Sequence, residues 1–202
     1  FDKSILPPYI LVKVGRELRS KGTPLEAVPW FEEVLKRGEG EYVGVAELGM
    51  AQIYANSGDS SKEQEALGMF DKVAKTYEGE PYEEEATVDK AHLLYKRQDW
   101  AAAATTYQYI FERKDWRKDR ELVAFNMATS FEKAGNAEMA LFAYTQFFAP
   151  PYQNKLEFSA EARLNATKLQ HNRGNKEKLP RLCWSLVAVS YTHLTLPTNG
   201  TV

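Results

Sequence analysis

A regular spacing of apolar residues runs along this chain of 202 residues. An alanine is followed four residues later by an aromatic residue and, three residues after that, by a bulky apolar one. Spacings of three and four residues place side chains on one face of an α-helix. The pattern therefore predicts four similar helices with one buried face each, marked by Ala27/Phe31/Val34, Ala66/Phe70/Val73, Ala103/Tyr107/Ile110 and Ala140/Tyr144/Phe147.

A second spacing precedes each of these helices. A small residue is followed three residues later by a large apolar one, at Gly15/Leu18, Ala51/Tyr54, Ala91/Leu94 and Ala128/Phe131. Four residues further on, the segment ends at Gly22, Gly58, Gln98 and Gly135. Thr167, Gln170 and Gly174 repeat the spacing weakly. The chain is thus predicted to be four helix hairpins and one further helix, the start of a degenerate fifth copy.

The links inside each hairpin carry signals for helix ends and helix starts. Glycine after the last apolar position suits a left-handed C-cap. Thr23, Asp59, Asp99 and Asn136 then stand where an N-cap is expected, and Pro24 fits a first helical turn. The link from Asp59 to Glu65 is longer than the others, so we expect a loop there. A single hairpin cannot bury its apolar faces alone, so the units are expected to stack.

These features resemble the tetratricopeptide signature, W-x2-L-G-x2-Y…A-x3-F…P. Here the pattern reads small-x2-aromatic or Leu, then Gly, then A-x3-F/Y, over about residues 8–174. The first Trp of the signature is missing from every copy, and the copies are longer than the family's usual length of about 34 residues. The resemblance implies an all-α solenoid of helix hairpins, wound as a right-handed superhelix. Four repeats and a partial fifth would occupy residues 8–181.

A shorter resemblance concerns the segment from Phe70 to Ala86. It is similar to repeats of bacterial cell-envelope proteins, such as the periplasmic division coordinator and the outer-membrane assembly lipoproteins. The resemblance implies a bacterial protein and favours a periplasmic over a cytoplasmic location.

The two ends of the chain differ from the repeats. Residues 1–7 are expected to form an N-terminal extension, and a chain that begins at Phe1 is expected to be a fragment or a processed product. Residues 182–202 contain no Asp, Glu, Lys or Arg, and residues 189–199 resemble a translated sequencing adaptor. We expect this tail to be non-native or disordered. The alternative is a genuine apolar cap over the last helix.

Composition narrows the classes of partner. The 26 basic and 28 acidic residues give a formal charge of -2, which argues against a protein that neutralises nucleic-acid phosphates. No apolar run approaches the roughly 18–20 residues that span a bilayer, so no transmembrane segment is expected. The single cysteine, Cys183, lies in the atypical tail and offers neither an intrachain disulfide nor a CxxC metal site.

No catalytic motif is apparent, so no enzyme activity, metal or cofactor is expected. The three histidines lack metal-ligand spacing, and neither GxSxG nor GxxxxGK[ST] occurs. Five glutamates between Glu78 and Glu85 are interpreted as a solvated helix start. The basic residues between Arg113 and Arg120 surround Trp116 but alternate with acidic ones, which favours a salt-bridged loop between repeats over a nucleic-acid site.

The resemblance implies that a protein or peptide ligand binds in a concave groove lined by the first helix of each hairpin. The groove positions directly follow, or stand two residues before, the small residue of each first helix. The expected groove residues are Lys13, Arg16, Gln52, Asp89, His92, Asn126, Thr129, Asn165 and Lys168, with Gly49 at the remaining matching position. The family's carboxylate-clamp arrangement of Lys and Asn is not reproduced, so chaperone C-termini are not expected as ligands.

Two other functions remain compatible with the sequence. The chain is the repeat arm of a larger enzyme whose catalytic domain lies elsewhere, or it is a structural component of a bacterial cell-envelope complex that binds through its convex side or loops. A helical-repeat fold alone does not separate these functions from a binding scaffold.

Overall fold

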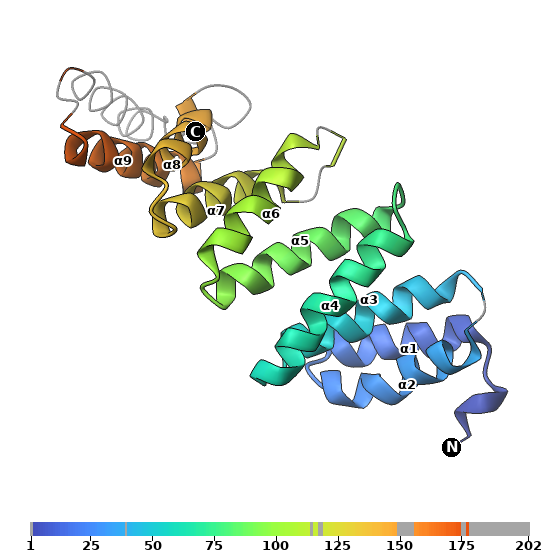
Figure 1. Ribbon diagram of the computed structural model, residues 1–202. Coiled ribbons are helices and arrows are strands. Elements are labelled where there is room, and N and C mark those ends of the chain that lie inside the picture. Colours follow the sequence, from blue (N-terminus) through green and yellow to red (C-terminus); the bar gives the residue numbers. More distant parts are fainter. Residues whose placement is uncertain are drawn as a thin grey trace, which may run out of the picture. The chain divides into compact units, whose positions relative to one another are not determined.

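The computed structural model describes residues 2–38, 40–113, 115–116, 119–148, 156–174 and 177. These residues form α-helices and short 3-10 turns, without any β-strand in the part described (Figure 1). The chain divides into two compact units, residues 1–97 and 98–202. The predicted all-α architecture is confirmed, while the expected tail, residues 182–202, lies outside the described residues.

The described residues of the first unit form a 3-10 turn followed by five α-helices. Consecutive helices pack against one another, and α3 also contacts α1 and α5. The elements are η1 (Lys3–Ile5), α1 (Pro8–Ser20), α2 (Pro24–Arg37), α3 (Tyr42–Ala55), α4 (Ser60–Thr76) and α5 (Pro81–Lys96).

The second unit holds the next four α-helices of the described chain. Helix α7 packs against α6, α8 and α9, and the 3-10 turn that ends α8 contacts α9. The elements are α6 (Trp100–Glu112), α7 (Arg120–Lys133), α8 (Ala137–Thr145), η2 (Gln146–Phe148) and α9 (Leu156–Asn172). Helix α9 lies where the sequence predicts the first helix of a fifth copy.

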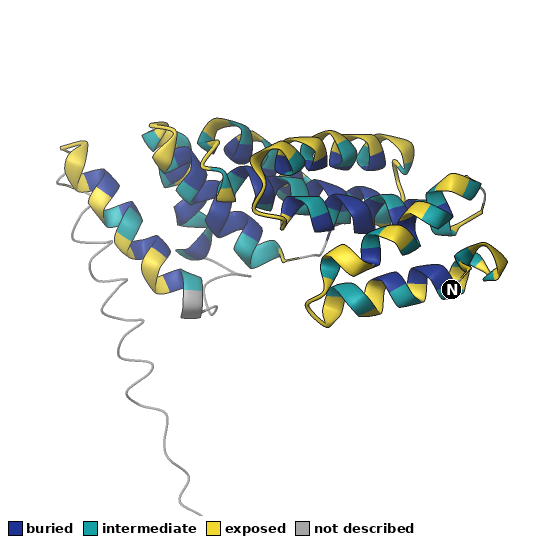
Figure 2. Ribbon diagram, turned by 90° about the horizontal axis from the view of Figure 1, so that it is seen from below, coloured by how far each residue is buried: buried dark blue, intermediate teal, exposed yellow. Residues whose placement is uncertain are grey.

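The predicted core residues are buried on the inner faces of their helices (Figure 2). All twelve members of the alanine, aromatic and apolar pattern are at most 1% exposed. The small residues allow close packing around the aromatic rings. A Cβ atom added to Gly15 or Gly49 would lie 2.8 or 2.7 Å from the ring of Phe31. The spacing therefore identified the packing face correctly, and Gly49 belongs to this packing rather than to a groove.

Three of the four predicted N-caps are confirmed. The Asp59 carboxylate accepts from the Ser61 amide at 2.8 Å, Asp99 from the Ala102 amide at 3.3 Å, and Asn136 from the Met139 amide at 3.1 Å. The Thr23 side chain makes no such bond, and its hydroxyl donates to the carbonyl of Leu18. The prediction of a loop from Asp59 to Glu65 is wrong. Asp59 is the N-cap of the 17-residue helix α4, and the following residues form its first turns.

Arg37 fixes the N-terminal extension to the first hairpin. Its guanidinium donates to the carbonyls of Leu6 at 2.7 Å and Lys3 at 3.0 Å, and the ammonium of Lys3 lies 5.1 Å from the ring centre of Trp30. The extension is thus held against α2 by hydrogen bonds from one arginine to its backbone carbonyl groups.

The segment after α6 uses its aromatic and basic residues internally. Trp116 is only 5% exposed, and the guanidinium of Arg113 stacks 4.4 Å from its ring centre. Arg120 donates to the carbonyls of Ile110, Phe111 and Arg113, which caps the C-terminal end of α6. One ion pair of the predicted salt-bridged loop is present, since the Arg113 guanidinium lies 3.6 Å from the Asp115 carboxylate. Lys114, Arg117 and Lys118 lie outside the described residues.

The glutamates around Pro81 differ from the expectation of a wholly solvated helix start. Glu78 and Glu80 are exposed, but Glu83 is only 5% exposed. The Glu83 carboxylate accepts from the Gly79 amide at 2.8 Å. A glutamate at the third position of a helix can accept a hydrogen bond from a backbone amide at the helix start. Glu83 makes such a bond, and its side chain is therefore buried instead of solvated.

Candidate partner-binding surface

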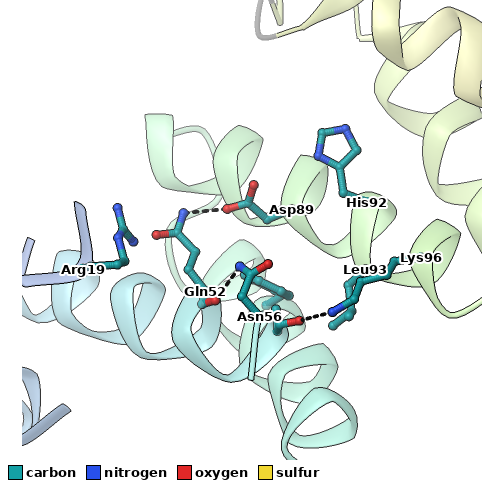
Figure 3. Close-up of a pocket in the computed structure, with 9 residues that line it drawn as sticks. Arg19, Gln52, Asn56, Asp89, His92, Leu93 and Lys96 are labelled. Carbon is teal, nitrogen blue, oxygen red and sulfur yellow. Dashed lines mark hydrogen bonds between the residues drawn. The ribbon is translucent and has the colours of Figure 1, made fainter. Parts of the chain in front are cut away.

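A pocket of about 410 Å³ opens on the first-helix side of the first unit (Figure 3). Arg19 comes from α1, Gln52 comes from α3 and Asn56 is the residue that caps its C-terminal end, and Asp89, His92 and Lys96 come from α5. Ala55, Phe70 and Leu93 complete its lining. The volume is at the lower end of the range of about 300–1,000 Å³ that is typical of ligand pockets. Three of the predicted groove residues, Gln52, Asp89 and His92, are thus brought together in one site.

Gln52 is held at the centre of the pocket by two carboxylates of α5. Its amide nitrogen donates to Asp89 Oδ2 at 2.6 Å and to Glu85 Oε1 at 3.0 Å. A glutamine amide carries two N–H donors and one carbonyl acceptor. Both donors are therefore directed at α5, and the orientation of the amide is fixed.

Arg19 contributes a cation at the α1 side of the pocket. Burial lowers the pKa of its guanidinium, while the charges of Glu85 and Asp89 oppose that effect. Within the described residues its side chain has no hydrogen-bond acceptor and no carboxylate within 4.0 Å. The Arg19 N–H groups, which Figure 3 shows beside Gln52, are therefore available to an incoming acceptor.

Lys96 has a structural role at the other end of the pocket. Its ammonium donates to Glu63 Oε1 at 2.8 Å and to the carbonyl of Ala55 at 3.2 Å. Glu63 is only 9% exposed, and Arg97 adds a second cation 3.8 Å from its carboxylate. Lys96, on α5, thus links the end of α3 to α4, and its ammonium is paired with Glu63.

The remaining predicted residues of the first unit occupy the neighbouring surface. Arg16 lines a second hollow of about 280 Å³ with Val12, Glu41, Tyr42, Val45 and Tyr82. Lys13 is exposed on the same helix and lines neither hollow. Because Arg16 and Arg19 are three residues apart, they lie on one face of α1.

The predicted groove residues of the second unit are differently placed. Asn126 is buried, and its amide donates to the Tyr107 hydroxyl at 3.1 Å. Asn165 donates to the Tyr144 hydroxyl at 3.3 Å, and Thr129 lies 3.4 Å from the same oxygen. Lys168 is exposed. Three of these four residues therefore bond to buried aromatic residues of the second helices.

The difference between the units follows from one atom at a repeated position. The aromatic residue of the repeat is Phe31 or Phe70 in the first unit but Tyr107 or Tyr144 in the second. A buried tyrosine hydroxyl requires a polar partner, which a phenylalanine does not. Tyr144 also donates to Glu132 at 2.7 Å, and burial together with that carboxylate raises its pKa. The second unit thus uses its first-helix polar residues to satisfy its core.

The sequence prediction missed Arg19, Asn56, Glu85 and Lys96. Asn56 and Lys96 lie four residues after the predicted Gln52 and His92, and Glu85 lies four before Asp89. Residues four apart share a helix face, so extending the predicted stripe by one turn would have found these three. Arg19 follows Arg16 by three residues, so the same helical spacing would also have predicted Arg19 as a groove residue.

The described residues show neither a metal site nor a membrane span. No three side chains among their His, Cys, Asp and Glu residues are arranged to hold a metal ion. No helix in this part of the chain is both long and apolar enough to cross a membrane.

Comparison with known proteins identifies the fold. No family model and no curated protein sequence matches the chain. The solved structure of the "MamA RS-1 ArsTM double mutant" has a TM-score of 0.68 at 14% identity, covering 96% of this chain and 97% of that one. A putative kinesin light chain of Podosopora anserina with nearly identical TPR-like repeats has a TM-score of 0.65 at 16% identity, covering 96% of this chain and 99% of that one. The chain therefore has the tetratricopeptide-like helical-repeat fold.

Proposed function

We propose that this chain is an interaction scaffold that binds a protein or peptide partner on the first-helix surface of residues 8–97. The observation that carries the proposal is the pocket formed by α1, α3 and α5, where Gln52 is fixed by two carboxylates and the Arg19 side chain lies beside it. A fixed polar group and an available donor in a concave site are the features that orient a bound chain.

The proposed surface includes the five predicted residues of the first unit, Lys13, Arg16, Gln52, Asp89 and His92, together with Arg19 and Asn56. It leaves out Asn126, Thr129 and Asn165, whose side chains bond to Tyr107 and Tyr144. The proposal assigns no catalytic step to the chain, and it rests on the geometry of the pocket together with the repeat fold.

Site-specific crosslinking tests this surface. A photo-crosslinking amino acid replaces Asn56, which is exposed and lines the pocket, or Lys36, which is exposed on α2 as a matched control. After irradiation in an extract of the source cells, we expect a discrete adduct from position 56 that is absent from position 36. The captured partner is identified by mass spectrometry, purified and titrated against the unmodified chain by calorimetry.

Two substitutions connect the adduct to the pocket. Arg19→Ala and Gln52→Ala are each expected to weaken binding of the purified partner by about tenfold or more, since loss of a central polar contact commonly costs at least about 1.4 kcal/mol. Thermal melts establish that both variants fold. Equal labelling from both positions, or binding that neither substitution changes, would contradict the proposal.

A further inference from the structure

Helix α1 carries a row of positive charges that are not neutralised within the described residues. Glu17, the acidic residue of this helix, is paired with Lys21 at 3.0 Å. Lys13, Arg16 and Arg19 follow one another at spacings of three residues. In the part of the chain that the structure describes, their side chains have no hydrogen-bond acceptor and no carboxylate within 4.0 Å. Three cations of α1 therefore remain available to an anionic ligand.

Helix α5 shows the contrast, because both of its lysines are paired within the protein. Lys90 contacts the carboxylate of Asp71, and Lys96 contacts that of Glu63 at 2.8 Å. Both carboxylates belong to α4, the helix before α5. The first-helix surface of this unit therefore has its unpaired cations on α1.

Arg19 is half-buried, whereas Lys13 and Arg16 are exposed. Burial lowers the pKa of the Arg19 guanidinium. The charges of Glu85 and Asp89 oppose that effect, and the charge of Arg16 adds to it. A guanidinium that is partly removed from water beside a second cation gains from a bound carboxylate, which accepts two of its N–H groups in a charge-assisted pair. The pocket therefore presents Arg19 to an acidic side chain.

Arg16 stands at the second hollow, of about 280 Å³, which Tyr42 and Tyr82 also line. Glu41 lines it as well, but its carboxylate is not within 4.0 Å of the Arg16 guanidinium. The volume lies just below the range of about 300–1,000 Å³ that is typical of pockets for whole ligands, so the hollow suits a single side chain. Three residues of a helix rise by about 4.5 Å, so one short segment can reach both arginines.

We propose that the partner segment carries two neighbouring acidic side chains, one bound by Arg19 in the pocket and the other by Arg16 in the second hollow. The inference rests on the proposed function and adds the chemistry of its ligand. Lys13 increases the attraction for this segment, and a basic segment would meet repulsion from all three cations. The formal charge of -2 on the whole chain disfavours a nucleic acid as the anion, which leaves an acidic stretch of a protein.

A selection from random peptides tests the acidic pair. A display library of random nine-residue peptides is selected against the full chain and, separately, against its variant Arg16→Gln/Arg19→Gln. On the unmodified chain we expect enrichment of peptides with two acidic residues two to four positions apart. A spacing of two places them on one face of an extended segment, and a spacing of three or four on one face of a helix. The enrichment should be lost on the variant, whose fold is checked by a thermal melt.

Exchanging single charges then assigns each acidic residue to its arginine. In the selected peptide, each acidic residue in turn is replaced by the matching amide, asparagine or glutamine. Each replacement is expected to weaken binding to the unmodified chain at least about tenfold by fluorescence anisotropy. One replacement should have little further effect on Arg16→Gln and the other little further effect on Arg19→Gln, because the contact is already lost. Lys36→Gln, at an exposed position on α2, is the matched control and should bind as the unmodified chain does.

The outcomes separate this inference from the proposed function. Selection of basic or uncharged peptides whose binding is still weakened by Gln52→Ala would overturn the acidic pair and leave the binding surface intact. Acidic peptides that lose as much on amide replacement in both arginine variants as in the unmodified chain would also overturn it. An absence of peptides that depend on Gln52 or Arg19 would count against both.

Discussion

At the scale of single residues, the absence of a side chain decides how closely the helices approach. Gly15 on α1 and Gly49 on α3 both face the ring of Phe31, which is completely buried. Because the protein interior is close-packed, an added methyl group there has no free volume to occupy. Gly15 and Gly49 are thus one half of a close contact, and the Phe31 ring of the second helix is the other half.

Two glycine substitutions test this contact. Gly49→Ala places a Cβ 2.7 Å from Phe31, so we expect the free energy of unfolding to fall by about 1–3 kcal/mol. Gly68→Ala, in the interior of α4 with no atom within 4 Å of the added Cβ, should raise it by about 0.5–1 kcal/mol. Urea denaturation measures both, and two changes of the same sign would contradict the close contact at Phe31.

The Tyr77 hydroxyl makes the stability of the first unit depend on pH in the alkaline range. Burial and the neighbouring Glu47 raise the pKa of Tyr77 to about 12, and its hydroxyl donates to Glu47 at 3.3 Å. A tyrosine with a raised folded-state pKa contributes stability that is complete below pH 10 and is lost as the pH rises toward 12. The urea midpoint should therefore fall across this interval, and it should fall less in Tyr77→Phe. An identical pH profile for both proteins would exclude this contribution.

At the scale of the elements, each helix boundary depends on a few polar bonds. Asp59 caps α4 through two amides, and Arg120 satisfies three carbonyls at the end of α6. Gln98, just before the Asp99 cap, has a left-handed backbone with a φ of 61°. The other first helices have a glycine at this position, also with positive φ. These bonds stop and restart the chain within a few residues, which keeps the two helices of a hairpin adjacent.

Asp59 and Thr23 provide a matched comparison of N-caps. Asp59→Ala removes bonds to the Ser61 and Lys62 amides, so we expect a loss of about 0.5–2 kcal/mol in the free energy of unfolding. Thr23→Ala removes only an exposed bond to the Leu18 carbonyl and should cost less than about 0.5 kcal/mol. Thermal or chemical melts compare the two, and equal losses would show that the Asp59 cap does not stabilise α4.

At the scale of the whole molecule, the two units differ in how they use their polar residues. The first unit has apolar core clusters around Phe31 and Phe70 and leaves charged residues around a pocket. In the second unit, buried tyrosine hydroxyls bond to Asn126, Thr129 and Asn165. The same repeat therefore offers polar side chains to a pocket in one unit and uses them for packing in the other.

Binding should be visible in the stability of the full chain. A ligand that binds only the folded state stabilises it by about 2.7 kcal/mol at a concentration about one hundred times its dissociation constant. We expect the purified partner to raise the melting temperature of the chain but not that of Arg19→Ala. Amide hydrogen exchange should slow in α1, α3 and α5. Protection centred on α9 instead would place the site in the second unit.

The repeat spacing by itself determined the helices, the buried alanine and aromatic positions and most of the caps, because these depend on residues within two helical turns of one another. It could not determine which polar residues meet. Asp89 and Asn126 hold the same position in their repeats, two residues before the small residue. Asp89 lines the pocket, whereas Asn126 is buried against Tyr107. That difference depends on the Tyr107 hydroxyl, which lies on another helix. It also depends on the packing of α3 against α1 and α5, which brings Arg19 and Asp89, 70 positions apart in the sequence, to one pocket. Tertiary packing decided the site because the buried Tyr107 hydroxyl needs a polar partner and takes Asn126, whereas Asp89 bonds to Gln52 at the pocket.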